Sequence, residues 1–219
     1  MTRYTFLPLL LAATAASPAT AADLQTDFDS AVQAFNAGDY DAALEQFGAL
    51  VPRYDAKYKN AARPLYCARN DDERVAYQAL IDRQSAGTLV DAGFCEALYG
   101  QAYSYTESQQ TGAAIAPLRR AVQIAPLALG YRIELAYALS NTGHPDEART
   151  LYQQALDLGI AQDDEAVEAK ALRGLGAGAI ERKDWQQARD YYVRSQKLEP
   201  DSEIAKGQLE YIAEQSGGW

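Results

Sequence analysis

Small and bulky apolar residues return along the chain at a regular spacing. The pattern small, large, small occupies Ala114, Leu118 and Ala121, and residues of the same kinds follow 34 and then a further 40 positions later. Self-similarity at such a period predicts a repeated helical hairpin, because a four-residue spacing places these side chains on one helix face. The matching trios are Ala148, Tyr152 and Ala155; Ala188, Tyr192 and Ser195; and, near the start, Ala43, Phe47 and Leu50.

The repeats divide the chain into consecutive helical units and predict an all-α solenoid. One hairpin cannot bury its apolar stripe alone, so stacked hairpins share a continuous core. Gly100, Ala136 and Gly176 take the small position where the two helices of a hairpin touch. The predicted units are a first hairpin at 22–52, a degenerate helical pair or insert at 53–92, hairpins at 93–126 and 127–160, a hairpin with a short acidic insertion at 161–200, and a capping helix with a frayed tail at 201–219.

Residues 53–92 interrupt the repeat. We expect one helix before Pro64, a second helix near residues 72–83, and a loop at residues 84–90. Two interpretations stay open for this stretch. It is either a decayed repeat that is retained for stability, or a specialised insert that contacts a partner.

The last predicted helix has one apolar face. Asp201 or Ser202 is a suitable residue to cap its start. The side chains expected to face the core are Ile204, Leu209, Ile212 and Ala213.

The N-terminus has the features of a secretory signal peptide. Arg3 precedes an apolar run at residues 6–16, and Ala19 and Ala21 supply the small-x-small pattern that precedes cleavage. About eleven apolar residues would span about 16 Å as a helix, which is too short for a hydrocarbon core of roughly 30 Å. We therefore expect residues 1–21 to be cleaved and the mature chain to be a soluble periplasmic protein without membrane insertion.

Export changes the interpretation of the two cysteines. In an oxidising compartment, Cys67 and Cys95 are expected to form a disulfide, and the alternative is a pair of buried free thiols. A metal site is disfavoured, because His144 is the only histidine and no Cys-x-x-Cys spacing supplies further ligands.

Charge and side-chain chemistry narrow the function classes. The formal charge is −10 and no cluster of Lys or Arg is long enough to follow a phosphate backbone, so nucleic acid is disfavoured as a partner. Acid–base or nucleophilic catalysis usually recruits histidine, a reactive cysteine or paired carboxylates. His144 falls in a predicted turn, and the pairs Asp71-Asp72 and Asp163-Asp164 fall in predicted connections. We therefore expect no enzyme activity and no cofactor.

Three segments resemble the second half of tetratricopeptide-repeat (TPR) units. They are GDYDAALEQF, TGHPDEARTLYQQAL and RKDWQQARDYYVRSQKLEP, and Pro126 and Pro200 occupy the place of the proline that closes a unit in that family. The layout is also similar to that of secreted bacterial TPR proteins without assigned function. The resemblance covers about residues 25–52 and 93–214.

This resemblance implies a right-handed superhelix whose concave wall is formed by the first helices of successive units. In the family, positions on these helices receive extended or helical peptides. The residues carried over to that groove are Gln101, Tyr105, Tyr137, Asn141, Lys170 and Arg173, with Phe94, Ala97, Ile133 and Glu181 beside them.

Two functions follow from these observations. The first is a non-catalytic scaffold or adaptor in the bacterial cell envelope that binds a protein or peptide in the concave groove. The second is a rigid structural subunit or inhibitor-like protein that binds a folded partner through its convex face or through residues 53–92.

Overall fold

The computed structural model describes residues 21–217, and within this range the chain forms ten helices and two short strands. The prediction of an all-α repeat fold is confirmed. The signal-peptide prediction rests on residues 1–20 and lies outside the described residues. The elements are α1 (Ala21–Asn36), α2 (Tyr40–Tyr58), β1 (Leu65–Cys67), α3 (Asp71–Gln84), β2 (Thr88–Val90), α4 (Ala92–Glu107), α5 (Thr111–Ile124), α6 (Leu129–Ser140), α7 (Pro145–Gln162), α8 (Glu165–Glu181), α9 (Trp185–Leu198) and α10 (Glu203–Gln215).

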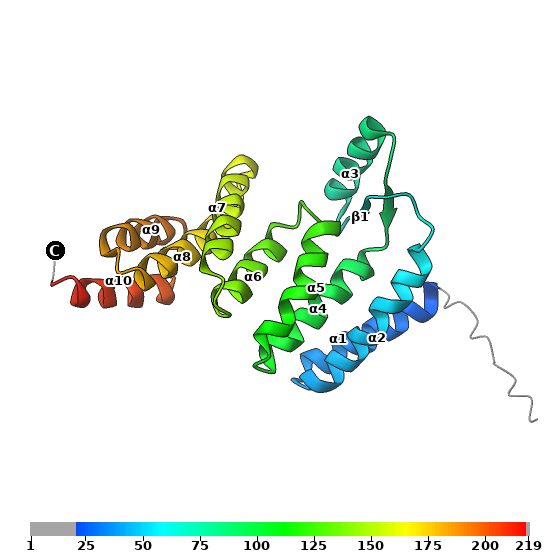
Figure 1. Ribbon diagram of the computed structural model, residues 1–219, viewed down its shortest axis with the longest axis horizontal. Coiled ribbons are helices and arrows are strands. Elements are labelled where there is room, and N and C mark those ends of the chain that lie inside the picture. The colour runs from blue at the N-terminus through cyan, green and yellow to red at the C-terminus, as the bar shows by residue number, and fades with distance from the viewer. Residues whose placement is uncertain (1–20, 218–219) are drawn as a thin grey trace, which may run out of the picture.

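Eight of these helices pair into four hairpins that follow one another along the long axis of the molecule (Figure 1). The first helices of the hairpins are α1, α4, α6 and α8, and the second helices are α2, α5, α7 and α9. Successive hairpins meet where a second helix packs on the next first helix, as α7 packs on α8. The final helix, α10, packs on α9.

Polar side chains and turn residues set where the helices begin and end. Five helices start at a side chain that accepts a hydrogen bond from a backbone N–H three residues on, which satisfies a donor that the helix leaves free. These caps are Asp39 (α2), Asn70 (α3), Asp164 (α8), Asp184 (α9) and Ser202 (α10). Each hairpin turn also contains one residue with a left-handed φ, which ends the first helix. These residues are Gly38, Gln109, Gly143 and Lys183.

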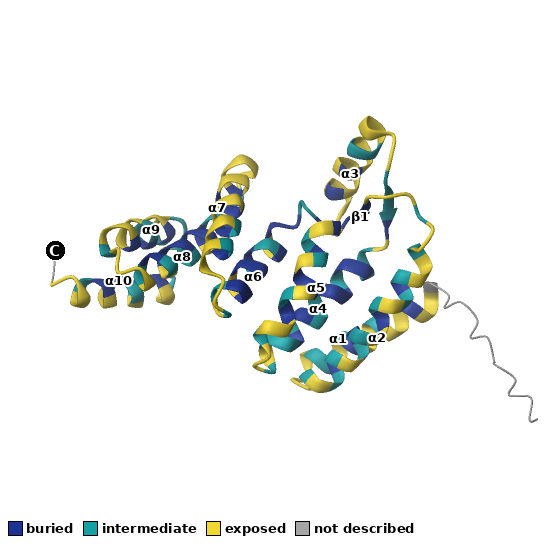
Figure 2. Ribbon diagram, viewed as in Figure 1, coloured by how far each residue is buried: buried dark blue, intermediate teal, exposed yellow. Residues whose placement is uncertain are grey.

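The core follows the interfaces between helices, where the buried residues of Figure 2 lie. Two glycines of α8 allow rings to approach its backbone. A Cβ on Gly176 would stand 2.7 Å from the ring of Tyr192 in the same hairpin, and a Cβ on Gly174 would stand 2.3 Å from the ring of Tyr152 in the preceding hairpin. Both rings are buried, so a side chain at either glycine would displace packed atoms.

Gly100 does not lie at the crossing predicted for it. A Cβ on Gly100 would stand 2.5 Å from the ring of Phe47, which belongs to the preceding hairpin. The residue one repeat before Ala136 is Ala102, which is buried in one core cluster with Ala114 of α5. The first-helix register assigned to α4 was therefore two residues out. Glycine and alanine both fit a close helix crossing, so the pattern of small residues did not distinguish them.

Between α2 and α4, residues 59–91 form an insert that is not a helical hairpin. The strands β1 and β2 make a two-stranded parallel sheet, connected through α3 (Figure 1). The helix expected near residues 72–83 is confirmed as α3, but no separate helix forms before Pro64, where α2 simply continues to Tyr58. The expected loop at residues 84–90 ends in β2. All three residues of β1 are buried, and β1 pairs with β2 from Leu65 opposite Thr88 to Cys67 opposite Val90.

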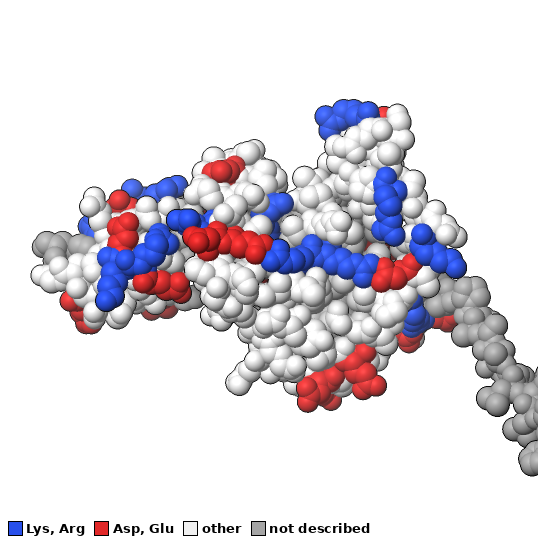
Figure 3. Space-filling view, in the orientation of Figure 1, with Lys and Arg blue, Asp and Glu red and all other residues white. Residues whose placement is uncertain are grey.

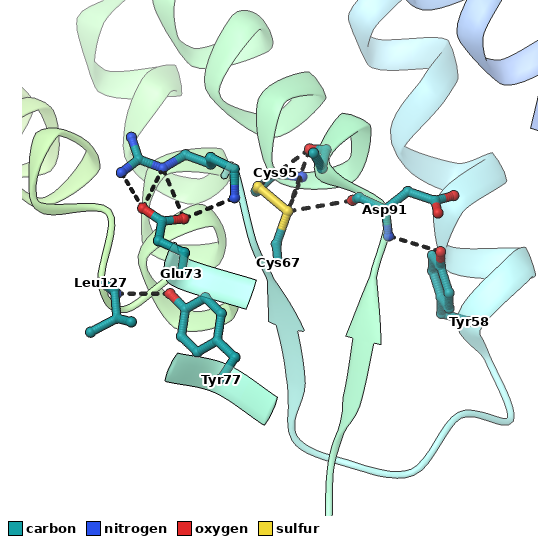
Figure 4. The surroundings of a disulfide bond; sticks show 9 residues. Tyr58, Cys67, Glu73, Tyr77, Asp91, Cys95 and Leu127 are labelled. Atoms are coloured by element: carbon teal, nitrogen blue, oxygen red, sulfur yellow. Dashed lines mark hydrogen bonds and ion pairs between the residues drawn. A yellow bond between two sulfur atoms is a disulfide. The ribbon is translucent and has the colours of Figure 1, made fainter. Parts of the chain in front are cut away.

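Single contacts of different kinds fix the insert to the hairpins (Figure 4). The predicted disulfide is present and joins Cys67 of β1 to Cys95 of α4. The hydroxyl of Tyr77 in α3 accepts a hydrogen bond of 2.9 Å from the backbone N–H of Leu127, which lies between α5 and α6. Burial raises the pKa of Tyr77 to about 12.

Two further contacts hold the edges of the insert. The guanidinium of Arg69 pairs with the carboxylate of Glu73 and lies 5.3 Å from the ring centroid of Tyr131 in α6. At the other edge, the hydroxyl of Tyr58 accepts a hydrogen bond of 2.9 Å from the backbone N–H of Asp91. The insert therefore contacts α2, α4, α6 and the α5–α6 turn.

Ion pairs connect the second helices of successive hairpins on the face that these helices share. Arg120 of α5 pairs with Asp55 of α2, and Arg119 of α5 pairs with Glu147 of α7. Figure 3 shows a band of alternating acidic and basic side chains that crosses the molecule on this side. Solvent reaches these pairs, so each contributes at most about 1 kcal/mol to stability.

The C-terminal helix buries a narrower face than the sequence indicated. Ala205 and Ile212 of α10 are fully buried, whereas Ile204 is 64% exposed. The expectation that Ile204 faces the core is wrong. Ser202 caps the helix, which starts at Glu203. In this helix Ala205, rather than Ile204, faces α9.

Candidate binding groove

Three adjoining hollows line the face formed by the first helices, and together they are called the groove here. The N-terminal hollow, between α1, α2 and α4, has a volume of about 410 Å³. The central hollow, between α4, α6, α8 and α10, has a volume of about 510 Å³. The insert hollow, between α3, α6 and α8, has a volume of about 630 Å³.

Shared residues make the hollows continuous. Tyr103 lines both the N-terminal and the central hollow. Ile133, Glu134 and Lys170 line both the central and the insert hollow. A chain segment lying along the first helices would therefore meet one surface that extends from α1 to α8.

Aromatic rings run along the N-terminal part of this surface and end at a cation. Phe35 lies edge-on to Tyr103 at 5.3 Å between ring centroids, and Tyr99 stacks on Tyr131 at 4.8 Å. Tyr103 and Tyr99 are 5.8 Å apart and join these two pairs. Arg69 of the insert lies over the ring of Tyr131, the last ring of this series. The rings give the groove a rigid apolar floor with polar edges.

Four of the six residues predicted for the groove lie together in the central hollow: Tyr137, Asn141, Lys170 and Arg173. The ring of Tyr137 is 47% exposed, and the side-chain amide of Asn141 donates a hydrogen bond of 2.8 Å to the Tyr137 carbonyl oxygen. Ile133 and Glu181, predicted beside them, line the same hollow.

The other two predicted residues, Gln101 and Tyr105, do not line these hollows. The amide nitrogen of Gln101 lies 3.3 Å from the point where a Cβ on Gly48 of α2 would stand, and Tyr105 packs against the core of the α4–α7 hairpins. One repeat before Tyr137 and Asn141 stand Tyr103 and Glu107, and both line the central hollow.

The two-residue register error in α4 accounts for this displacement. It also placed Phe94 and Ala97 on the groove wall, whereas both are fully buried. The spacing that relates the trios of the second helices applies equally to the first helices. Applied from Tyr137, it would have identified Tyr103 from the sequence.

Glu134 is a groove residue that sequence reasoning missed. It is half-buried, and among the described residues it has no hydrogen bond or ion pair. Burial raises the pKa of Glu134, and the ammonium group of Lys170 opposes this shift. Burial also raises the pKa of Tyr99 and of Tyr152, and the nearby Glu134 carboxylate adds to both shifts.

Glu96 is a second half-buried carboxylate in the groove, at the edge of the N-terminal hollow. Burial raises the pKa of Glu96, and the guanidinium of Arg69 opposes this shift. Both carboxylates stand on first helices. In a sequence pattern, glutamate is interpreted as a solvent-facing residue. The sequence therefore did not indicate that these two carboxylates are half-buried.

Arg173 has a structural role. Its guanidinium pairs with Glu199 and lies 3.3 Å from the hydroxyl of Ser195, which itself donates a hydrogen bond of 3.1 Å to the Ala169 carbonyl oxygen. This network holds the end of α9 against α8. Lys170, in contrast, is exposed and has no ion pair within the described chain.

Among residues 21–217, no group of three or more His, Cys, Asp or Glu side chains is placed to hold a metal ion. In that range, none of the helices has the length and apolar character needed to cross a membrane. His144 is exposed in the α6–α7 turn.

Comparison with known families accounts for the repeats. Residues 96–128 and 129–158 each match a family model of the tetratricopeptide repeat. The chain therefore contains tetratricopeptide repeats. The two matched segments correspond to the hairpins α4–α5 and α6–α7, and TPR units are typically modules for protein interaction rather than catalysis.

Two solved structures have a similar fold. The MamA protein is 16% identical with a TM-score of 0.61, over 89% of this chain and 82% of that chain. The apo form of RapI is 12% identical with a TM-score of 0.64, over 89% of this chain, and this chain spans 64% of RapI. At these identities the likeness concerns the fold. No curated protein sequence matches the chain.

Proposed function

We propose that this TPR protein is a non-catalytic scaffold that binds a protein or peptide segment in its groove. The observation that carries the proposal is the continuity of the three hollows along the first helices, through Tyr103 and through Ile133, Glu134 and Lys170. Aromatic rings and a small number of polar groups along a continuous concave surface are typical of sites that hold an extended chain.

The proposed setting is the cell envelope, after export. The leader pattern at residues 1–21 supports this setting, and the Cys67–Cys95 disulfide supports an oxidising compartment. Intact mass measurement of the protein from its own cells tests the proposal. The expected mass is that of a chain that begins after Ala21 or Ala22 and contains one disulfide. A full-length mass beginning at Met1, with two free thiols, would rule out export.

A second candidate function is the binding of a folded partner through the insert. One observation favours it: Val75 of α3 is 70% exposed, the most exposed large apolar side chain among the described residues, and Arg74 stands next to it. An exposed apolar side chain on a protruding helix offers a contact point, although a single such residue is common on protein surfaces.

Site-specific cross-linking separates the two functions. A photoreactive phenylalanine analogue replaces Tyr103 in the groove in one variant and Val75 on the insert in the other, and each variant is irradiated in envelope extract. The groove function predicts a specific cross-linked product from position 103 and none from position 75. A product from position 75 and none from position 103 would show that the partner binds the insert.

Side-chain replacement then measures the contribution of each surface to affinity for the cross-linked partner. The groove variant Tyr137→Ala with Asn141→Ala removes exposed side chains and leaves the Arg173–Glu199 pair intact. We expect it to weaken binding by at least about tenfold without a change in melting temperature. The matched insert variant Val75→Ala with Arg74→Ala is expected to bind like the unmodified protein.

A further inference from the structure

We infer that the segment bound in the groove carries a lysine or arginine whose cationic group pairs with Glu134 among the tyrosines of the central hollow. This inference rests on the proposed function and specifies the chemistry of its ligand. Three features of Glu134 support it: its position in the repeat, its surroundings, and the balance of charge along the groove.

The repeat itself gives no structural reason for a carboxylate at position 134. Glu134 follows Gly100 and precedes Gly174 by the same two intervals that separate the repeated trios of the second helices. At both glycines a large ring from the preceding hairpin occupies the space a side chain would need. The residue that corresponds to these rings before α6 is Leu118, which is smaller than a ring, and position 134 carries a side chain where the other two repeats have glycine.

The carboxylate placed in that space is incompletely compensated. It is half-buried, it accepts no hydrogen bond within the described chain, and the ammonium group of Lys170 is not within ion-pair distance. Removing a carboxylate from water without a partner costs free energy, so such a group stabilises a complex in which a cation reaches it.

The charges along the groove favour a cationic ligand over an anionic one. Four carboxylates line the N-terminal and central hollows, and the charge of Arg173 is neutralised by Glu199. Among the described residues, Lys170 is the one remaining cation that lines the central hollow. The four carboxylates are Glu96, Glu107, Glu134 and Glu181.

The surrounding rings suit a cation as well. Glu134 lies close enough to Tyr99, Tyr103 and Tyr152 for its charge to raise the pKa of each of them, after the larger effect of burial and, for Tyr103, of Glu107. An ammonium or guanidinium group that approached the carboxylate would therefore also lie near tyrosine rings. Aromatic faces attract cations, and arginine stacks on them especially well.

The effect of replacing Lys170 distinguishes a cationic ligand from an anionic one. If the ligand is cationic, Lys170 competes with it for Glu134 and repels it. If the ligand is anionic, Lys170 is the group that would bind it. Replacing Lys170 with methionine should therefore strengthen binding in the first case and weaken it in the second.

The test uses four pools of fluorescein-labelled octapeptides that are identical in their random apolar and polar positions. The central residue is fixed as arginine, lysine, citrulline or glutamate, and citrulline is the neutral match for arginine. Binding is followed by fluorescence anisotropy up to about 1 mM protein, which covers the weak affinities expected of short peptides. The proteins compared are the unmodified chain, Glu134→Gln, Lys170→Met, and Glu45→Gln as a control that removes an exposed carboxylate of α2 outside the groove.

We expect the unmodified protein to bind the arginine pool at least about tenfold more tightly than the citrulline pool. Glu134→Gln should remove most of this preference, Lys170→Met should increase affinity for the arginine and lysine pools, and Glu45→Gln should change neither. Melting temperatures verify that each variant is folded.

Binding of all four pools with equal affinity would overturn the inference and leave the groove function standing. Preference for the glutamate pool, lost in Lys170→Met, would overturn it in favour of an anionic ligand. Failure of every pool to bind would also overturn it, and the cross-linking at position 103 would then decide separately whether the groove is used at all.

Discussion

The hairpins and the insert are two regions of one chain that are stabilised in different ways. In the hairpins, one arrangement recurs: a ring from a second helix packs against a small residue of a first helix, as Tyr192 packs against Gly176. In the insert, each contact occurs once: one disulfide, one tyrosine hydroxyl bonded to a backbone N–H, and one arginine over a ring.

The difference shows why one region was visible in the sequence and the other was not. A recurring contact leaves a periodic pattern, because each copy selects the same kinds of side chain at the same spacing. A contact that occurs once leaves no such pattern. The following predictions test whether the two regions depend on these two kinds of contact, in order of decreasing effect.

The largest effect is expected from removing the disulfide. The bond closes a loop with a sequence separation of 28 residues, which in the chain-entropy model stabilises the fold by about 3.5 kcal/mol. The double variant Cys67→Ala with Cys95→Ala should lose about this much free energy of unfolding in urea titrations. A thiol reductant should destabilise the unmodified protein similarly and leave the double variant unaffected. A loss below about 1 kcal/mol would mean that the other contacts suffice to hold the insert.

A methyl group at a recurring crossing point should cost somewhat less. In Gly174→Ala the added carbon would stand 2.3 Å from the ring of Tyr152, and because that ring is buried, we expect a loss of about 2 kcal/mol from overpacking. Gly178→Ala is the matched control on the same helix. Its Cβ would meet only the end of the Arg182 side chain at 3.5 Å, so the better helix propensity of alanine should stabilise it by about 0.5 kcal/mol. Thermal unfolding of both variants compares the two sites.

The hydrogen bond of Tyr77 gives the next effect. Tyr77→Phe leaves the N–H of Leu127 without its acceptor in a partly buried position, so we expect a loss of about 1.5 kcal/mol. Tyr66→Phe is the control, because the Tyr66 hydroxyl donates only a long hydrogen bond of 3.3 Å to Gln84. Hydrogen exchange at Leu127 should accelerate in the first variant alone. Equal behaviour of the two variants would show that this bond does not anchor α3.

The smallest effect has the opposite sign and concerns the one groove position that departs from the repeat. Burial raises the pKa of Glu134 above its unfolded value, so the folded state binds the proton more tightly, and ionisation costs stability as the pH rises above about 4.3. Glu134→Gln should therefore melt at a slightly higher temperature than the unmodified protein at pH 7. The difference should vanish near pH 3.5, where the carboxyl is protonated in both states.

The same comparison in Glu45→Gln, where an exposed carboxyl of α2 is removed, should show no such trend. If Glu134→Gln were less stable at pH 7, its carboxylate would be a structural group of the fold rather than a group held ready for a ligand.

The fold was largely predictable because the trios around Ala114, Ala148 and Ala188 recur in phase. The disulfide was predictable because the leader pattern indicates an oxidising compartment, where two cysteines in a domain of this size usually pair. The small sheet was not: β1 and β2 have three residues each, and their pairing depends on a parallel connection through α3 that no local pattern encodes.

For the groove, the resemblance to TPR units placed Tyr137, Asn141 and Lys170 on one surface, although Tyr137 and Asn141 lie at α6 and Lys170 lies on α8. The sequence did not reveal that Arg173 pairs with Glu199, because that contact joins residues of different helices. It also did not reveal that Glu134 is half-buried, because the burial of a charged residue depends on the elements that pack around it and not on the residue itself.

The insert also has a consequence for how the molecule unfolds. In a solenoid whose units contact only their neighbours, local opening proceeds from an end, one unit at a time. Residues 59–91 bridge α2, α4, α6 and the α5–α6 turn, so these elements should open in a single cooperative step. The helices from α7 onward lack such a brace among the described residues, and they should unravel progressively from α10. A ligand that contacts α4, α6 and α8 would bind both the region that opens in one step and the region that unravels from α10. It would therefore couple the unfolding of the two regions.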